Sequence, residues 1–402
     1  MNKFSFTLLK QDSSTKARAG IIHTPHGNIQ TPYLIPVATR AHIIAINKKD
    51  LASLSPQALL SNTYHLHMLN LDKKIKKVGG LHKFMHFNKP IITDSGGFQA
   101  FSLGLGRVHN SRKIGFIPNP DNLKNKPEKQ DPKNRYAIIT ESGVKFKSVY
   151  DNTWRFMGPK ESMKIQSDLG ADIIMAFDEC TSPFSNKEYT KKSLVKTHRW
   201  ALECLKYKNE KQALYGIIQG GEYKDLRVRA ARYINSLPFE GIALGGSLGK
   251  SKKTMHKILD WIIPCLDSRP RHMLGIGWIE DIFECVKRGM DTFDCVEMTR
   301  VARHGQLFIS PLSGGSKKNN FKLKIGNNIY TEDNKKPDSS CKCPTCKKYT
   351  RKNLRGMFKS KNPEYNRLAT IHNIYFMQTL CKIIRNSIMQ GKFNKLYNEW
   401  II

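Results

Sequence analysis

Eight short apolar segments recur along this chain, and each ends at a polar or glycine residue. They are residues 34–37, 58–62, 91–94, 173–178, 214–219, 241–246, 272–275 and 290–294. Continuous apolar runs of this length are typical of strands buried on both faces, as in a parallel sheet. Helix-like stretches lie between several of them, at residues 159–169, 186–207, 223–236, 254–263 and 279–288. Eight strands alternating with helices predict an α/β fold, a (β/α)8 TIM barrel.

An open doubly wound sheet is the alternative architecture, but no Gly-x-Gly-x-x-Gly follows the first strand to support it. In a barrel of this kind, catalytic residues lie at the carboxyl ends of the strands. The residues at those ends are Asp94, Asp178, Gln219, Gly246, Gly275 and Asp294. We therefore expect the reactive site among these positions.

The pattern of strands and helices predicts a barrel domain over residues 1–314 and a second subdomain over 315–402. Residues 107–135 interrupt the barrel pattern as a basic, proline-containing insertion without apolar periodicity. Residues 315–340 form a polar connection, and an amphipathic helix is expected from Leu368.

The charge of the chain indicates a polyanionic partner. Its formal net charge is +34, from 67 Lys and Arg against 33 Asp and Glu, which most often indicates nucleic acid. A bias toward Lys, Asn and Ile explains part of this excess. No apolar run reaches 18 residues, so no membrane contact is expected. The N-terminus lacks a secretory h-region and nine cysteines suit a reducing compartment, so we expect a cytoplasmic protein.

Three cysteines lie within six residues, and a histidine follows 26 residues after the last of them. These are Cys341, Cys343, Cys346 and His372. Zinc favours four tetrahedral nitrogen and sulfur ligands, and a Cys3His set leaves no position open for water. The alternative is a chance cluster of reduced thiols beside an unrelated histidine. The spacing predicts one structural Zn²⁺ per chain, with the chemistry elsewhere.

Two strand ends carry groups suited to reading a purine. Thr93-Asp-Ser-Gly-Gly-Phe-Gln99 follows a buried strand, and its glycines and Phe98 allow close approach to, and stacking on, a planar ligand. Asp178 and Gln219 each end a further strand. A carboxylate accepts hydrogen bonds from a ring N–H and an exocyclic amine, while an amide donates to a ring carbonyl. Taken singly, an ordinary turn explains residues 93–99 equally well, and a solvated strand end is the better explanation of Asp178.

Asp94 and Asp294 together allow glycosyl chemistry at an anomeric carbon, with one carboxylate attacking and the other handling protons. Just beyond Asp294 lie Thr299 and two arginines, Arg300 and Arg303, whose guanidinium groups suit the phosphates of an RNA backbone.

These motifs, in this order, resemble the tRNA-guanine transglycosylase family, and the likeness spans nearly the whole chain apart from residues 107–135. It rests on residues 93–99, Asp178-Glu-Cys180, Gln219-Gly220, Gly245-Gly246, Phe293-Asp-Cys-Val296, Thr299-Arg300 and the Cys3His set. The resemblance implies a (β/α)8 barrel with a C-terminal zinc-binding subdomain.

The resemblance also implies roles. Asp294 would be the nucleophile that expels the wobble guanine of a G-U-N anticodon tRNA and holds the tRNA as a covalent ribosyl ester. Asp94 would be the general acid/base for the incoming 7-deazaguanine base. Base-pocket positions would be Asp178, Gln219, Gly246, Phe98, Leu274, Gly275 and Cys180, with Asn62 close to the nucleophile.

Departures from the family pattern leave the substrate open. The family usually has a proline before the Thr-Arg pair, and this chain instead has Val296-Glu297-Met298 before Thr299. Glu297 adds a carboxylate close to the site, and the sequence gives no role for it. Cys180 favours the aminomethyl base, 7-aminomethyl-7-deazaguanine, whereas small Gly249 would admit queuine. The alternatives in function are a non-catalytic zinc-containing tRNA-binding or scaffold subunit and an archaeosine-type enzyme. The resemblance further implies a homodimer or a pair with a homologous subunit.

Overall fold

A single parallel sheet of eight strands forms the centre of the molecule. The computed structural model describes residues 4–101, 137–246 and 248–402. The strand order is β4-β14-β13-β12-β11-β10-β6-β5, and a parallel bridge between Val37 and Leu60 joins the two outer strands. The predicted TIM barrel is thereby confirmed. The strands are β4 (Tyr33–Pro36), β5 (Leu59–Ser61), β6 (Ile91–Thr93), β10 (Ile173–Met175), β11 (Ala213–Ile218), β12 (Gly241–Leu244), β13 (Arg271–Met273) and β14 (Thr292–Cys295).

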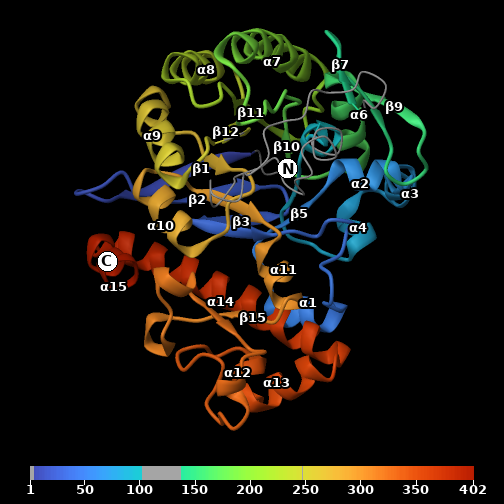
Figure 1. Cartoon of the computed structure of the whole chain (residues 1–402). Helices are drawn as coiled ribbons and strands as arrows, with labels where there is room; N and C mark the ends of the chain where they lie inside the picture. Colours follow the sequence, from blue (N-terminus) through green and yellow to red (C-terminus); the bar gives the residue numbers. More distant parts are fainter. Residues whose placement is uncertain (1–3, 102–136, 247) are drawn as a thin grey trace.

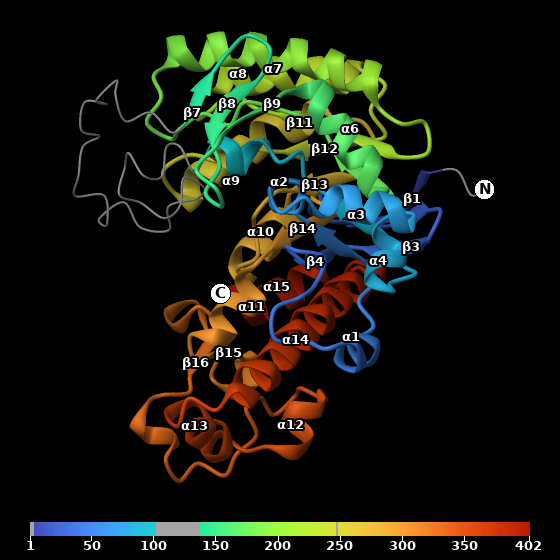
Figure 2. The same ribbon diagram turned by 90° about the vertical axis from the view of Figure 1, so that its right-hand side faces the viewer.

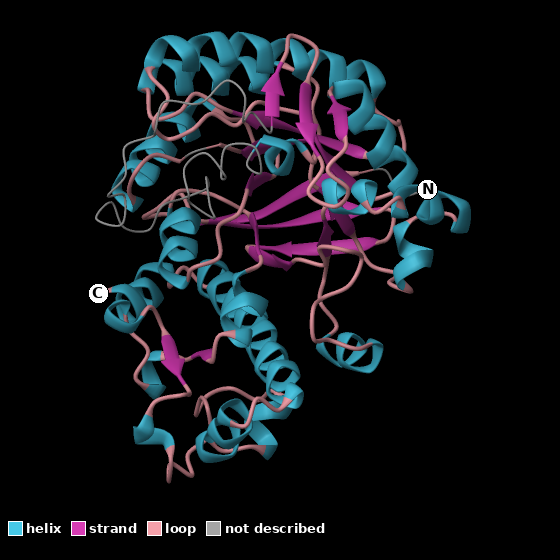
Figure 3. Ribbon diagram, turned by 45° about the vertical axis from the view of Figure 1, so that its right-hand side comes forward, coloured by secondary structure: helices cyan, strands magenta, loops and turns pink. Residues whose placement is uncertain are grey.

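Helices surround this sheet (Figure 3). They are α2 (Thr63–Met68), α3 (Leu71–Val78), α4 (Leu81–Met85), α6 (Pro159–Leu169), α7 (Lys187–Tyr207), α8 (Lys224–Ser236), α9 (Lys252–Ile262) and α10 (Ile279–Lys287). All six residues of β11 are buried, because helices cover the outer face and neighbouring strands fill the interior. The five helices expected between strands are confirmed to within two residues at each end.

An antiparallel sheet covers the amino-terminal end of the barrel. It consists of β1 (Ser5–Gln11), β2 (Arg18–Thr24) and β3 (Gly27–Thr31). Nε of Arg18 donates a 2.8 Å hydrogen bond to Asp291, just before β14, and His26 contacts Asp172, just before β10, at 2.6 Å. Since both aspartates precede their strands, the opposite end of the barrel, where the strands finish, is left for a site.

A second antiparallel sheet was not predicted. It contains β7 (Ala137–Ile139), β8 (Val144–Lys147) and β9 (Trp154–Met157) and leads directly into α6. The basic insertion predicted at residues 107–135 lies outside the described residues.

The C-terminal part forms a smaller body beside the barrel (Figures 1 and 2). It contains α11 (Glu297–Arg303), β15 (Gln306–Phe308), β16 (Lys322–Lys324), α12 (Pro344–Lys348), α13 (Arg351–Lys359), α14 (Pro363–Met389) and α15 (Phe393–Ile401). Leu307, Leu323 and Leu354 belong to a separate apolar core there, while the later residues of α14, such as Met377 and Ile384, pack in the barrel core. Helix α14 therefore connects the two bodies, although the boundary at residue 314 stays a prediction.

Two details of this region differ from expectation. Helix α14 begins at Pro363 and not at Leu368, because the Asn362 side chain caps it by accepting from Glu364 N and proline suits the first helical position. The polar connection at 315–340 contains β16, which pairs with β15. In the described part of the chain, no helix is long and apolar enough to cross a membrane.

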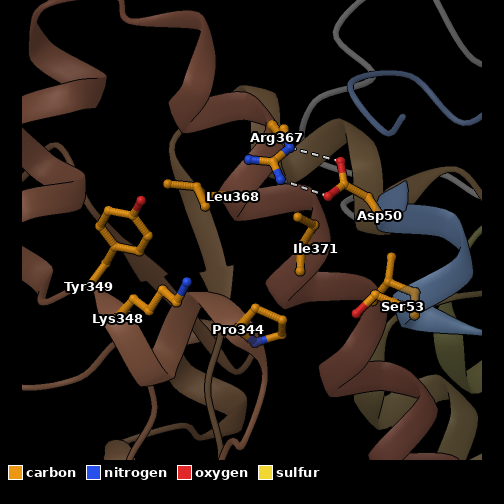
Figure 4. Close-up of a pocket in the computed structure, with 9 residues that line it drawn as sticks. Asp50, Ser53, Pro344, Lys348, Tyr349, Arg367, Leu368 and Ile371 are labelled. Atoms are coloured by element: carbon orange, nitrogen blue, oxygen red, sulfur yellow. Dashed lines mark hydrogen bonds and ion pairs between the residues drawn. The ribbon is translucent and has the colours of Figure 1, made fainter. Parts of the chain in front are cut away.

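An ion pair between Arg367 and Asp50 connects α14 to a helix of the barrel domain (Figure 4). Nε and Nη2 of Arg367 donate to the two carboxylate oxygens of Asp50 in α1 (Lys48–Leu54), at 2.8 and 2.7 Å. A cavity of about 250 Å³ lies beside this pair, lined also by Pro344 and Lys348 of α12. Because Nε and Nη2 each donate to a different carboxylate oxygen, the pair constrains the orientation of α14 against α1 by geometry as well as charge.

Candidate active site

Asp94 directly follows β6, and three N–H groups surround its carboxylate. Asn62 Nδ2 donates to Oδ2 at 2.6 Å, Gln99 Nε2 donates to Oδ2 at 3.0 Å, and the backbone N–H of Thr63 donates to Oδ1 at 2.8 Å. Burial raises the pKa of Asp94 against the effect of these donors, and the charge of Asp294 raises it further. The two aspartates are thus close enough to interact, as a shared site requires.

Asp294 lies on β14, and only one of its two carboxylate oxygens is hydrogen-bonded by described residues. The backbone N–H of Gly275 donates to Oδ1 at 3.1 Å, and Nε2 of His272 contacts the same oxygen at 3.2 Å. Among the described residues, none is hydrogen-bonded to Oδ2. Asp294 retains 15% of its side-chain exposure, so Oδ2 can meet a ligand. The sequence interpretation placed Gly275 here but missed His272.

Asp178 and Gln219 meet at the ends of β10 and β11, as their predicted positions required. Nε2 of Gln219 donates a hydrogen bond to Oδ2 of Asp178. Burial raises the pKa of Asp178 to about 6, and the neighbouring charge of Glu179 adds to the rise. Buried Oε1 of Gln219 has no hydrogen-bond partner among the described residues. An unsatisfied buried acceptor of this kind is typical of a position that a ligand completes.

The paired glycines after β12 are required by this amide. Gly246 has φ +81°, and a Cβ there would lie 2.0 Å from Oε1 of Gln219. A Cβ at Gly245 would lie 2.6 Å from Ile217. Only glycine lets the backbone approach the Asp178–Gln219 pair this closely, so the loop lies directly against the pair.

The remaining base-pocket candidates follow the strands β6, β10 and β13 and so lie at the same end of the barrel. Residues 97–101 are helical, and Gly97 approaches Asp178 so closely that a Cβ would lie 3.3 Å from its carbonyl oxygen. Phe98, the next residue, is 40% exposed and free to cover a ligand. Cys180 is buried. Leu274 is half-buried and Gly275 exposed, with open space where a Cβ would be.

The candidate RNA contacts lie on α11, immediately after Asp294. Arg303 has an Nη1 that no described residue hydrogen-bonds, whereas Arg300 donates to Glu297. Thr299 is buried, and its hydroxyl donates to the carbonyl of Val296 at 3.1 Å, within the first turn. Glu297 also accepts from buried Lys322 of β16 at 3.1 Å. This carboxylate, unexplained by the sequence, therefore joins α11 to β16 within the smaller body.

The predicted metal ligands come together, although 26 residues separate Cys346 from His372. All four side chains are buried, and their ligand atoms lie within 4.8 Å of one another. Nδ1 of His372 is 3.5 Å from the sulfur of Cys343 and 3.2 Å from that of Cys346. Nε2 of His372 donates to the carbonyl of Phe308 at 2.7 Å, which leaves Nδ1 as the ligand atom. A buried Cys3His set of this kind fits a structural metal ion.

Comparison with known proteins agrees with this geometry. The family model described as queuine tRNA-ribosyltransferase matches residues 12–402. A protein of Archaeoglobus fulgidus, provisionally named a queuine tRNA-ribosyltransferase, is 48% identical over 389 residues, 96% of each chain. The queuine tRNA-ribosyltransferase of Halothermothrix orenii is 40% identical over 99% of this chain and 97% of its own. That of Roseiflexus sp. is 37% identical over 99% of both.

Proposed function

This chain belongs to the queuine tRNA-ribosyltransferase family, the tRNA-guanine transglycosylases, and on that premise we propose the reaction that it performs. It exchanges the wobble guanine of G-U-N anticodon tRNAs for a 7-deazaguanine base by double displacement. The observation that carries the proposal is the pair of interacting aspartates, one with a bare oxygen and one with a raised pKa.

In the first displacement, Oδ2 of Asp294 attacks C1′ of the wobble ribose. The C1′–N9 bond breaks, guanine leaves with a proton from the carboxyl group of Asp94, and a ribosyl ester of Asp294 remains. Gly275 N–H holds Oδ1, so that the unbonded oxygen faces the ribose. The ribose becomes reachable when the base is splayed out of the anticodon loop.

In the second displacement, Asp94 removes the N9 proton of the incoming base. N9 then attacks C1′, the ester bond breaks, and Asp294 returns as a carboxylate. A carboxylate whose pKa is raised by burial is a stronger base than an exposed aspartate, which suits Asp94 to accept this proton. Because one N-glycosidic bond replaces another, no energy cofactor is consumed.

Recognition of the base falls to the buried pair at the ends of β10 and β11. Asp178 accepts from the ring N–H and the exocyclic amine. Nε2 of Gln219 has two hydrogens, of which one is donated to Asp178 and the other is donated to the ring carbonyl. Gly246 and Leu274 form walls of the pocket, and Phe98 stacks on the base. Cys180 favours 7-aminomethyl-7-deazaguanine as the incoming base, with queuine as the alternative that Gly249 would admit.

The smaller body has a structural and RNA-binding role and takes no part in the chemical steps. Zn²⁺ bound by Cys341, Cys343, Cys346 and His372 would have all four positions filled, and so it would supply structural stability only. Nη1 of Arg303 is buried without a hydrogen-bond partner among the described residues, and this guanidinium suits a phosphate next to the wobble nucleotide. Buried Thr299 and the Glu297–Arg300 pair stabilise the helix that carries it. The chain would act in the cytoplasm as a homodimer or with a homologous subunit.

A non-catalytic tRNA-binding subunit is the second candidate, and the intact Asp94, Asp178, Gln219 and Asp294 argue against it. The test is incorporation of radiolabelled guanine into tRNA bearing a G-U-N anticodon, with a tRNA carrying another wobble base as control. We expect label only in the first tRNA, and Asp178→Ala should abolish it. Competition between the aminomethyl base and queuine in the same assay decides the substrate. Binding of the tRNA without exchange would support the non-catalytic subunit.

A further inference from the structure

The candidate nucleophile has a buried imidazole beside it. His272 lies on β13 and is fully buried, with Nε2 3.2 Å from Oδ1 of Asp294. Its other ring nitrogen, Nδ1, lies 2.9 Å from the hydroxyl of Thr292. Thr292 and Asp294 are two residues apart on β14, so their side chains face the same side of the strand. The strand register, which pairs His272 with Thr292, places the ring against both.

The chemistry of the partners sets the direction of both hydrogen bonds. A carboxylate only accepts, so Nε2 carries a hydrogen and donates to Asp294. In a neutral imidazole Nδ1 is then an acceptor, and the Thr292 hydroxyl donates to it. Thr292 thereby fixes the tautomer that presents Nε2–H to the nucleophile, in the manner by which a second partner orients a histidine ligand.

We propose that His272 is a positioning residue for Asp294 and that it assists release of the covalent intermediate. This inference rests on the proposed double displacement. His272 and the N–H of Gly275 together hold Oδ1 of Asp294 and direct Oδ2 at the ribose. In the ester, Oδ1 is the carbonyl oxygen. When N9 of the incoming base forms its bond to C1′ and the C1′–Oδ2 bond breaks, the electron pair returns to the carboxylate, which the Nε2–H bond stabilises.

This arrangement predicts an unequal effect on the two displacements. A donor that stabilises the free carboxylate favours the second displacement, which regenerates that carboxylate, and disfavours its consumption in the first. Removing the donor should therefore slow turnover while the ribosyl ester accumulates. A purely structural role for His272 would lower folding stability and active enzyme together, without raising the fraction of ester.

The test uses two amides of matched chemistry. In His272→Gln the side-chain N–H can occupy the place of Nε2, whereas in His272→Asn it can occupy only that of Nδ1. We expect kcat for guanine exchange to fall about 10- to 100-fold in His272→Asn, the loss of one hydrogen bond to a charged group. KM for tRNA should fall together with kcat, because kcat/KM for tRNA depends on the first displacement alone, and the fraction of chain trapped as a covalent tRNA adduct should rise. His272→Gln should restore most of kcat.

Thr292 gives a second test that does not alter the histidine. Thr292→Val removes the hydroxyl with little change of shape and should produce the same two effects more weakly, while Thr292→Ser should resemble the wild type. Equal kcat and adduct fraction in wild type, His272→Asn and Thr292→Val would overturn the inference. A fall in kcat together with melting temperature, unrelieved in His272→Gln, would also overturn it. If the wild type exchanges no guanine, the proposed function itself fails, and this inference with it.

Discussion

Asn62 donates a 2.6 Å hydrogen bond to Oδ2 of Asp94, the carboxylate whose pKa burial raises. The hydrogen bond favours the charged form and opposes the rise. Asn62→Leu should therefore raise the pKa of Asp94 further and move the acid limb of the exchange rate to higher pH. We expect a roughly tenfold loss of rate at pH 7, from loss of one charged hydrogen bond. The measurement is kcat against pH, and Asn62→Asp, which adds a like charge, should move the limb in the same direction.

Asp178 predicts a pH dependence of base binding. Its pKa is raised to about 6 by burial and by Glu179, and only the ionised form accepts from both donors of guanine. KM for free guanine should thus fall as the pH rises through about 6 and level off above it. Glu179→Gln removes the neighbouring charge and should move this transition to lower pH. A KM that is constant between pH 5 and 8 would contradict the proposed role.

Asp172 and the two histidines that contact it, His26 and His82, predict that the fold is sensitive to acid. Burial raises the pKa of Asp172, but hydrogen bonds from His82, His26 and the N–H of Ile91 outweigh this and leave it lowered. A lowered folded pKa contributes stability above the ordinary value of 3.8, and that stability is lost as the pH falls through the folded pKa. Asp172→Asn should cost about 2 kcal/mol of unfolding free energy at pH 7 and flatten its acid dependence, measured by urea unfolding. An unchanged acid dependence would refute the assignment.

The Cys3His set predicts a structural and not a catalytic metal. His372→Ala should lower the zinc content below one per chain and lower the melting temperature, because metal binding contributes folding free energy. Cys265→Ser, at a half-buried cysteine outside the set, should keep the wild-type zinc content. A chelator should inactivate the protein slowly, in step with unfolding measured by circular dichroism. Immediate inactivation of a still folded protein would instead indicate a catalytic metal.

The strands and their reactive ends could be predicted because the signal is local. Each buried strand corresponds to an apolar run in the sequence. The topology of the barrel alone then places the polar residue that follows it, such as Asp94 or Asp178. The Cys341–Cys346 spacing likewise indicates metal binding without knowledge of the fold. These predictions depend on neither register nor side-chain rotamers.

Cross-strand and long-range contacts could not be predicted in the same way. The contact of His272 with Asp294 depends on the register of β13 against β14, and the Lys322–Glu297 contact joins residues 25 positions apart. The sheet of β7, β8 and β9 was missed because its residues are partly exposed and their apolar pattern is weak. Since such contacts are set by tertiary packing, only the structure shows them.

The covalent ribosyl ester of Asp294 is the central claim, and trapping it is the most direct measurement. Wild-type chain and Asp294→Asn would each be incubated with G-U-N anticodon tRNA and separated on a denaturing gel. We predict a shifted band of chain joined to tRNA for the wild type, dispersed by added guanine, and no such band for Asp294→Asn. A band of wild-type intensity in Asp294→Asn, or guanine exchange by that variant at the wild-type rate, would contradict the proposed mechanism.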